Sequence, residues 1–385
     1  MRKASVPASV ERLERFYGRM TKPIRQVVSV LAALWVVIPA FAAAPRYVDI
    51  TWFSISNVYY QVGPLNIVTD GYITRIPASA FFGGGGGLAR TRQPYRPDVA
   101  GVTRVLAALG GPSKVNLLLT GHSHFDHSFD TATWSKLTGA NIIGSRTTCL
   151  QAEAENIPAA RCRAVYGREA IKLADGVTMR VVRWNHSGDS AQNPEQHNPV
   201  ELKGIPVPDA ATGGLHAGVA EDFPNGGGNR GYLFTVDGPQ GRVSWFFENS
   251  ASPLDLQTPI NIDGVDYGAP LDNLKWAMKD AGLVSVDLWI GTGGRAIAEM
   301  VLPILEPRFY LPVHWDGLYE PFFAGMPRAY EDRALEELLT AARVTLVRPR
   351  QYMDKWRLDR TGMRPVDGAA MKRALGFQDV QSFGK

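Results

Sequence analysis

Three histidines and an aspartate lie within six residues of one another, directly after a short apolar run. The run is Val115 to Leu119, and it is followed by Gly121-His122-Ser123-His124-Phe125-Asp126-His127. An apolar run of this length is typical of a buried strand. Residues i and i+2 of extended backbone share a side, so His122 and His124 can bind one cation while Asp126 and His127 face a second. The chain must therefore end a buried strand at metal-binding side chains.

Other predicted strands end in the same way. The run from Val177 to Trp184 leads to His186, and the run from Phe309 to Val313 leads to His314. The remaining elements that we expect are a hairpin of residues 58–62 and 65–69 ending at Asp70, a strand at 243–247, helices at 98–109, 271–280 and 332–342, and strands at 284–290 and 344–347. Helices that alternate with strands predict a mixed α/β chain.

Imidazole and carboxylate at this density favour a borderline metal ion. Zn²⁺ is the first choice, with Fe or Mn as alternatives, and one or two ions would bind. A structural zinc site would need no carboxylate and usually uses cysteine. A chance cluster in a polar loop is the weaker interpretation, because the cluster directly follows a buried strand and single histidines end later strands.

The segment from His122 to His127 resembles the H-x-H-x-D-H signature of the metallo-β-lactamase-fold hydrolase superfamily. The resemblance implies an α+β/α/β chain folded as a four-layer αβ/βα sandwich, with metals at one edge. It also implies that the first metal is held by His122, His124 and His186, and the second by Asp126, His127 and His314. Asp126 would in addition orient a hydroxide that attacks a carbonyl or phosphoryl centre.

Two further positions follow from this resemblance. Asp70 resembles an early aspartate of the family that supports the site as a hydrogen-bond acceptor, although an Asp-Gly turn explains it equally well. The family usually has Gly-Asp after the strand at 243–247, whereas this chain has Glu248-Asn249. Either Asn249 takes the place of the bridging aspartate as a weak, neutral ligand, or a shift by one residue lets Glu248 supply a carboxylate.

A long segment rich in Gly, Pro, Asn and Asp runs from residue 187 to residue 230. A loop of this length inside a domain is usually a lid or a binding loop. His197 and His216 lie in it, and His216, between glycines, is the better candidate to meet substrate. Trp315 is a second candidate for a substrate contact, with packing in the core as the alternative. The loop of Gly83 to Gly87 is expected near the opening.

The net charge of +4 arises at the N-terminus. Residues 1–42 hold seven Lys/Arg and two acids, which leaves 34 basic and 35 acidic residues in the rest of the chain. We therefore expect no nucleic-acid partner. The basic start, an apolar run from Val27 to Ile38 and a small-residue stretch near Ala42 predict a signal peptide and export to the periplasm or medium, with retention as an anchor as the alternative.

The two cysteines, Cys149 and Cys162, then lie in the exported part, as a disulfide or as two unrelated buried thiols. We expect a single hydrolase domain over residues 43–385 that cleaves an ester, lactone, amide or phosphodiester bond in a small or lipid-like substrate. The alternatives are a β-lactamase and a non-catalytic metal-binding protein on the same fold. No protein partner is evident from the sequence.

Overall fold

A computed structural model describes residues 45–79 and 93–377. Residues 42–385 form one compact unit. It contains two large sheets, and the strands of the second sheet lie in the chain between β7 (Cys162–Ala164) and β18 (Asp354–Asp359) of the first. The predicted signal segment, the loop of Gly83 to Gly87 and the neighbouring Arg90 and Arg92 lie outside the described residues.

The first sheet has the order β19-β18-β1-β2-β3-β5-β6-β7. Its strands are β1 (Tyr47–Ser54), β2 (Asn57–Val62), β3 (Leu65–Thr69), β5 (Leu117–Leu119), β6 (Asn141–Gly144), β7 (Cys162–Ala164), β18 (Asp354–Asp359) and β19 (Gly362–Val366). Strands β1 to β3 pair antiparallel, whereas β3, β5, β6 and β7 pair in parallel. The carboxyl ends of these parallel strands therefore meet at one edge.

The second sheet has the order β17-β16-β15-β12-β11-β9-β8. Its strands are β8 (Ala170–Ala174), β9 (Val177–Trp184), β11 (Asn229–Gly238), β12 (Gly241–Phe247), β15 (Leu288–Gly291), β16 (Phe309–Pro312) and β17 (Thr345–Leu346). It repeats the plan of the first sheet, with antiparallel strands β8 to β12 followed by parallel strands β12 to β17. Short pairs add β4 (Pro94–Tyr95) with β10 (Leu215–His216), and β13 (Asn261–Ile262) with β14 (Val265–Asp266).

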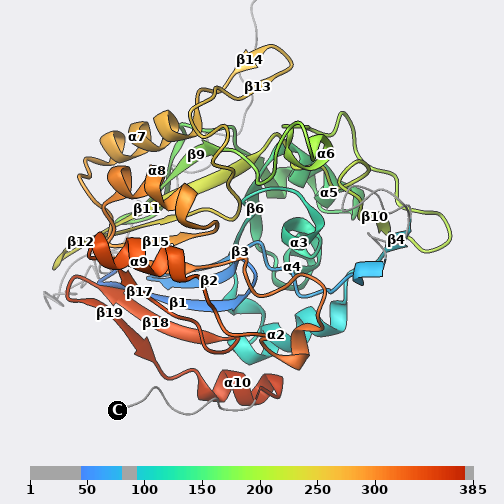
Figure 1. Cartoon of the computed structure of the whole chain (residues 1–385). Coiled ribbons are helices and arrows are strands. Elements are labelled where there is room, and N and C mark those ends of the chain that lie inside the picture. Colours follow the sequence, from blue (N-terminus) through green and yellow to red (C-terminus); the bar gives the residue numbers. More distant parts are fainter. Residues whose placement is uncertain (1–44, 80–92, 378–385) are drawn as a thin grey trace, which may run out of the picture. The chain divides into compact units, whose positions relative to one another are not determined.

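Helices cover the outer faces of the sheets (Figure 1). They are α2 (Val99–Leu109), α4 (Thr131–Thr138), α5 (Arg146–Ala154) and α10 (Ala369–Leu375) on the first sheet, and α7 (Pro270–Ala281), α8 (Arg295–Leu305) and α9 (Arg333–Ala341) on the second. Two further short helices, α3 (Phe125–Ser128) and α6 (Pro194–His197), lie in connections. The described residues thus form four layers in the order helix, sheet, sheet, helix, as the sequence predicted.

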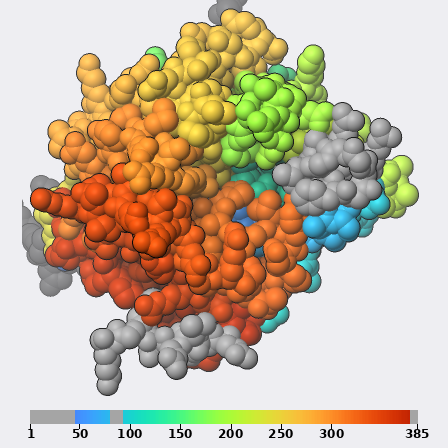
Figure 2. Space-filling model, viewed as in Figure 1, coloured from blue at the N-terminus to red at the C-terminus, as the bar shows by residue number. Residues whose placement is uncertain are grey.

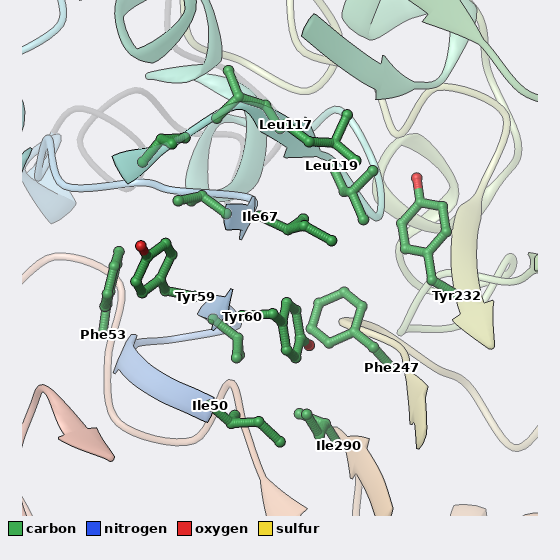
Figure 3. Close-up of a cluster of buried hydrophobic side chains, with 14 of the residues drawn as sticks. Ile50, Phe53, Tyr59, Tyr60, Ile67, Leu117, Leu119, Tyr232, Phe247 and Ile290 are labelled. Carbon is green, nitrogen blue, oxygen red and sulfur yellow. The ribbon is translucent and has the colours of Figure 1, made fainter. Parts of the chain in front are cut away.

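Central strands such as β2, β11 and β12 are largely buried on both faces because they lie between the facing sheet and a helix layer. In β12, Trp245 and Phe247 belong to the core between the sheets, whereas Phe246 belongs to the core under the helices of the second sheet. Figure 3 shows Tyr60 of the first sheet and Phe247 and Ile290 of the second pointing toward one another. A shift of one residue in β12 would exchange these faces, so packing fixes the register that places the following residues.

Most predicted elements are present, with shifted ends. Strand β5 begins at Leu117 rather than Val115, and β15 begins at Leu288 rather than Val284, whose side chain is 89% exposed. The segment after His186 is not structureless, because it contains α6 and β10, and it ends before Asn229, where β11 begins. The sequence did not predict strands β1, β6, β7, β8, β11, β18 and β19 or helices α4, α5, α8 and α10.

Cys149 of α5 and Cys162 of β7 form a disulfide, so the first of the two alternatives holds. The bond ties α5 to the edge strand of the first sheet. Within the described residues, no helix has the length and apolar character needed to cross a membrane.

Candidate metal centre

The six predicted ligands come from the ends of three strands that the two sheets bring together. His122, His124, Asp126 and His127 follow β5, and the last two lie in α3. His186 follows β9 and His314 follows β16. Figure 2 shows a hollow on this face, between the orange segment after β16 and the green segment after β9, with blue and teal residues of the first half of the chain at its bottom.

His122, His124 and His186 form the first group, with their ligand nitrogens within 4.8 Å of one another. The Nδ1–H of His186 donates to the carbonyl oxygen of Ser187 at 2.8 Å, and the Nδ1–H of His122 donates to Oδ1 of Asn249 at 3.0 Å. Both Nε2 atoms are then unprotonated, yet they lie 3.0 Å apart. Two lone pairs that face each other at this distance repel unless a cation lies between them. The donor set therefore fits a metal ion.

Asp126, His127 and His314 form a second group. Oδ2 of Asp126 lies 3.1 Å from Nε2 of His127 and 3.1 Å from Nε2 of His314, and the two Nε2 atoms are 3.2 Å apart. The Nδ1–H of His127 donates to Oδ2 of Asp70 at 2.9 Å, so its Nε2 is the free ligand atom of the neutral ring. His122, Asp126 and His127 also lie within 4.8 Å of one another, which makes the two groups neighbours.

Burial and neighbouring charges set the protonation of the site. Burial lowers the pKa of His124 to about 3, and burial also lowers the pKa values of His122 and His186 well below their ordinary value, so these rings are neutral. Burial alone would raise the pKa of Asp126, but His127 and His314 lower it well below its ordinary value. Neutral imidazoles and an ionised carboxylate are the forms that bind a metal.

Without a metal, a proton fills the second group. Burial lowers the pKa of His127, but the carboxylates of Asp126 and Asp70 outweigh this effect and raise it to about 10. The proton lies where a cation would bind, and metal binding must release it.

Asp70 supports the second group through hydrogen bonds. Its Oδ2 accepts hydrogen bonds from Ser56 Oγ, Asn249 Nδ2 and His127 Nδ1, at 2.7, 2.8 and 2.9 Å, and its Oδ1 accepts from the Gly121 N–H at 2.9 Å. The backbone of Asp70 has a φ of 59°, as a turn residue does. Both interpretations of Asp70 therefore apply, because the turn aims the carboxylate at His127.

Neither Asn249 nor Glu248 takes the place of a bridging carboxylate in this structure. The amide of Asn249 lies on the Nδ1 side of the two rings rather than on the side of the Nε2 ligand atoms, 3.0 Å from Nδ1 of His122 and 3.0 Å from Nδ1 of His127. Glu248 points away, and its Oε1 accepts the Thr292 N–H at 2.7 Å. Burial raises the pKa of Glu248 well above its ordinary value, which fits a neutral acid rather than a ligand. These contacts place neither side chain between the two groups, and the expectation that one of them bridges the metals stays a prediction.

The other candidates lie as follows. Trp315 stacks on Trp52 with ring centroids 5.6 Å apart and packs against the main core, so packing explains it. His216 pairs with Asp222 at 3.1 Å in the segment after β9. His197, in the same segment, pairs with Asp255 at 2.7 Å.

Two residues of the site were missed. Ser56, in the turn between β1 and β2, lies 3.0 Å from Nδ1 of His127. Asp316 accepts the Ile55 N–H at 3.0 Å, and the Ile55 carbonyl in turn accepts the His314 N–H at 3.0 Å. A lone serine in a turn carries no sequence signal, whereas Asp316 could have been noticed because it lies two residues after a predicted ligand.

Comparison with known proteins gives limited similarity. No protein-family profile matches the chain. A stretch of 72 residues, 19% of the chain, is 35% identical to a UPF0173 metal-dependent hydrolase of Pyrobaculum islandicum, and it spans 32% of that protein.

Two solved structures are similar to the chain at low identity. Igni18, a metallo hydrolase from Ignicoccus hospitalis, is 13% identical with a TM-score of 0.46, over 81% of this chain and 99% of that one. The metallo-β-lactamase SMB-1 is 15% identical with a TM-score of 0.28, over 65% of this chain and 80% of that one. The described residues form the layered sandwich that the resemblance implied, and the predicted histidine and aspartate ligands gather at one edge of its sheets.

Proposed function

We propose that this protein is an exported metal-dependent hydrolase that cleaves an ester, lactone, amide or phosphodiester bond. One observation carries the proposal: two neighbouring sets of ligand atoms converge, buried except at His314, and cations between them would offset the repulsion of their lone pairs and the charge of the carboxylate. His122, His124 and His186 would hold one divalent ion, and Asp126, His127 and His314 a second. We propose zinc, with iron or manganese as alternatives.

When bound, the metal ions would supply an acidified water and polarise the substrate oxygen. The residues around them have separable tasks. Asp126 is ionised at neutral pH, because His127 and His314 lower its pKa, so it can accept a hydrogen bond from a water molecule and orient it. His314 is the ligand nearest to solvent, with 23% of its side chain exposed, so substrate would enter on its side.

A small apolar core lies next to the second group. Phe125, which precedes Asp126 in the chain, packs there with Tyr72, Phe129 and Phe223, and the ring of the partly buried Tyr319 stacks on Phe125 with centroids 6.5 Å apart. We propose that the substrate carries an acyl, aryl or lipid-like part next to the scissile bond.

The test combines metal content with hydrolysis. Wild-type protein should bind two equivalents of zinc by elemental mass spectrometry, His127→Ala about one, and His124→Ala should lose hydrolysis of at least one of nitrophenyl esters, bis-nitrophenyl phosphate, lactones and a chromogenic cephalosporin. Lys275→Ala is the control, since Lys275 is 60% exposed on α7. Full activity of metal-poor His124→Ala would refute the hydrolase proposal.

One observation favours a second function, a non-catalytic metal-binding protein. The carboxylate expected between the two groups is replaced by the Asn249 amide, which contacts the histidines from behind. If metal-loaded wild-type protein hydrolysed no substrate class of the panel, this result would favour the second function.

A further inference from the structure

A histidine outside both ligand groups is connected to one of the ligands. His197 ends α6 and is 5% exposed. Its Nε2 lies 2.7 Å from Oδ2 of Asp255, and its Nδ1 lies 3.2 Å from the carbonyl oxygen of Ser187. Both ring nitrogens face acceptors, so the position and the plane of the ring are fixed from two sides.

The carbonyl that His197 contacts is the one that His186 uses. The Nδ1–H of His186 donates to the same Ser187 oxygen at 2.8 Å. The N–H of Ser187 donates to Ser250 Oγ at 2.9 Å, which fixes the other side of the residue. A ligand histidine whose second nitrogen donates to a fixed carbonyl keeps its tautomer and its ring orientation, and both affect metal affinity.

Helix α6 is in turn held to the rest of its segment. The side-chain Nδ2 of the buried Asn225 donates to the carbonyls of Gln196, His197 and Asn198, at 3.1, 3.1 and 2.7 Å. Its Oδ1 accepts the Val200 and Gly228 N–H groups, each at 3.0 Å. One side chain thus joins α6 to the residue before β11, so that α6 cannot shift alone.

We propose that His197 is a positioning residue for His186, and that it couples metal binding by His122, His124 and His186 to the order of residues 187–228. The inference rests on the metal binding proposed above, but on no particular substrate. If metal binding favours the ordered segment, then by linkage the ordered segment favours metal binding by the same factor. Loss of the His197 contact must therefore appear in two independent measurements.

The first measurement is zinc affinity, by competition with a chromogenic chelator. His197→Ala should weaken the tighter site about 10- to 100-fold, the usual effect of removing an outer partner of a ligand histidine. His197→Asn places an amide nitrogen where Nδ1 lies and should recover part of the affinity. Lys275→Ala is the control, because Lys275 is 60% exposed on α7, outside residues 187–228.

The second measurement is hydrogen exchange of residues 187–228 with and without zinc. In wild-type protein zinc should slow exchange there, and in His197→Ala this protection should fall by about the factor by which affinity falls. Should His197→Ala fail to fold, His197→Asn and Asp255→Asn replace it, and both should weaken affinity less than tenfold but more than Lys275→Ala.

The outcomes separate this inference from the proposed function. Wild-type protein that binds no metal refutes both. Wild-type protein that binds zinc while the His197 variants match it within twofold, with the same protection, refutes the coupling alone. Loss of affinity without loss of protection refutes the coupling and leaves only an orienting effect on His186.

Discussion

Single side chains decide how the two ligand groups are joined. Asn249 accepts from His122 through Oδ1 and donates to Asp70 through Nδ2. Only a side chain that offers both an acceptor and a donor can satisfy these neighbours. Gly121 leaves room for it, because a Cβ there would lie 2.3 Å from the Asn249 amide. The substitution that looked like a lost ligand is therefore a matched hydrogen-bond partner.

Asn249→Asp should destabilise the metal-free protein by about 1–3 kcal/mol, because the carboxylate cannot donate to Asp70 and adds a like charge beside it. Chemical denaturation in the presence of a chelator measures the change. Zinc should recover part of the loss, because cations offset the added charge. An unchanged unfolding free energy in chelator would contradict the role of the amide.

The metal-free protein should lose stability as the pH rises toward 10. The folded-state pKa of His127 is raised to about 10, above the unfolded value of about 6.5. The contribution of protonated His127 to the free energy of unfolding is then complete below the pKa of His127 in the unfolded chain, and it is lost as the pH rises through the pKa of His127 in the folded protein. Denaturation in chelator at several pH values between 6 and 10 should show this loss in wild-type protein and less of it in His127→Gln. If the free energy of unfolding changed with pH equally in wild-type protein and His127→Gln, the prediction would be wrong.

At the scale of elements, the strands that carry ligands were predicted well, and the connections were not. Strands β5 and β16 are short apolar runs of mostly buried residues, and β9 has Val177, Met179 and Val181 at every second position. The segment after His186 lacks periodicity because its order comes from side chains such as Asn225, which satisfy its backbone groups one by one. Helix α8 contains Pro303 near its end, which the usual helix signals exclude.

Glu248→Gln tests whether Glu248, the residue directly after β12, binds a metal ion. Burial raises the pKa of Glu248, so the neutral amide should replace the neutral acid with little cost at pH 7, and it should keep the metal content of wild-type protein. Elemental analysis beside His127→Ala, which should lose about one equivalent, provides the comparison. Loss of a metal ion in Glu248→Gln would show that Glu248 is a ligand after all.

At the scale of the whole molecule, the two sheets repeat one plan, antiparallel strands followed by parallel strands. Parallel strands end at one edge, and binding sites of such sheets form outside these carboxyl ends. The first sheet supplies the residues after β3 and β5, and the second supplies those after β9, β12 and β16. The centre therefore exists only when both sheets are packed together.

Export remains a prediction from residues 1–42, which lie outside the described part of the chain. The basic start, the apolar run and the small residues predict cleavage near Ala42 or Ala44. The intact mass of protein recovered from the periplasm or medium should match a chain that begins after one of these residues. A full-length mass in the membrane fraction would support the retained anchor instead.

The sequence by itself determined a mixed α/β chain with candidate ligands at its strand ends, because both follow from local patterns: apolar runs of strand length, and polar residues directly after them. The four-layer sandwich and the division of the ligands between two metals were implied by the resemblance of residues 122–127 to a family signature. Only the tertiary structure decided which side of each ring faces the ligand atoms of its neighbours, and what Asn249, Ser56 and His197 do. Asn249 donates to Asp70 across 179 residues and Ser56 contacts His127 across 71, whereas His197 reaches Ser187 across a segment without periodicity. Hydrogen bonds between such distant residues depend on how the two sheets pack, which no local pattern encodes.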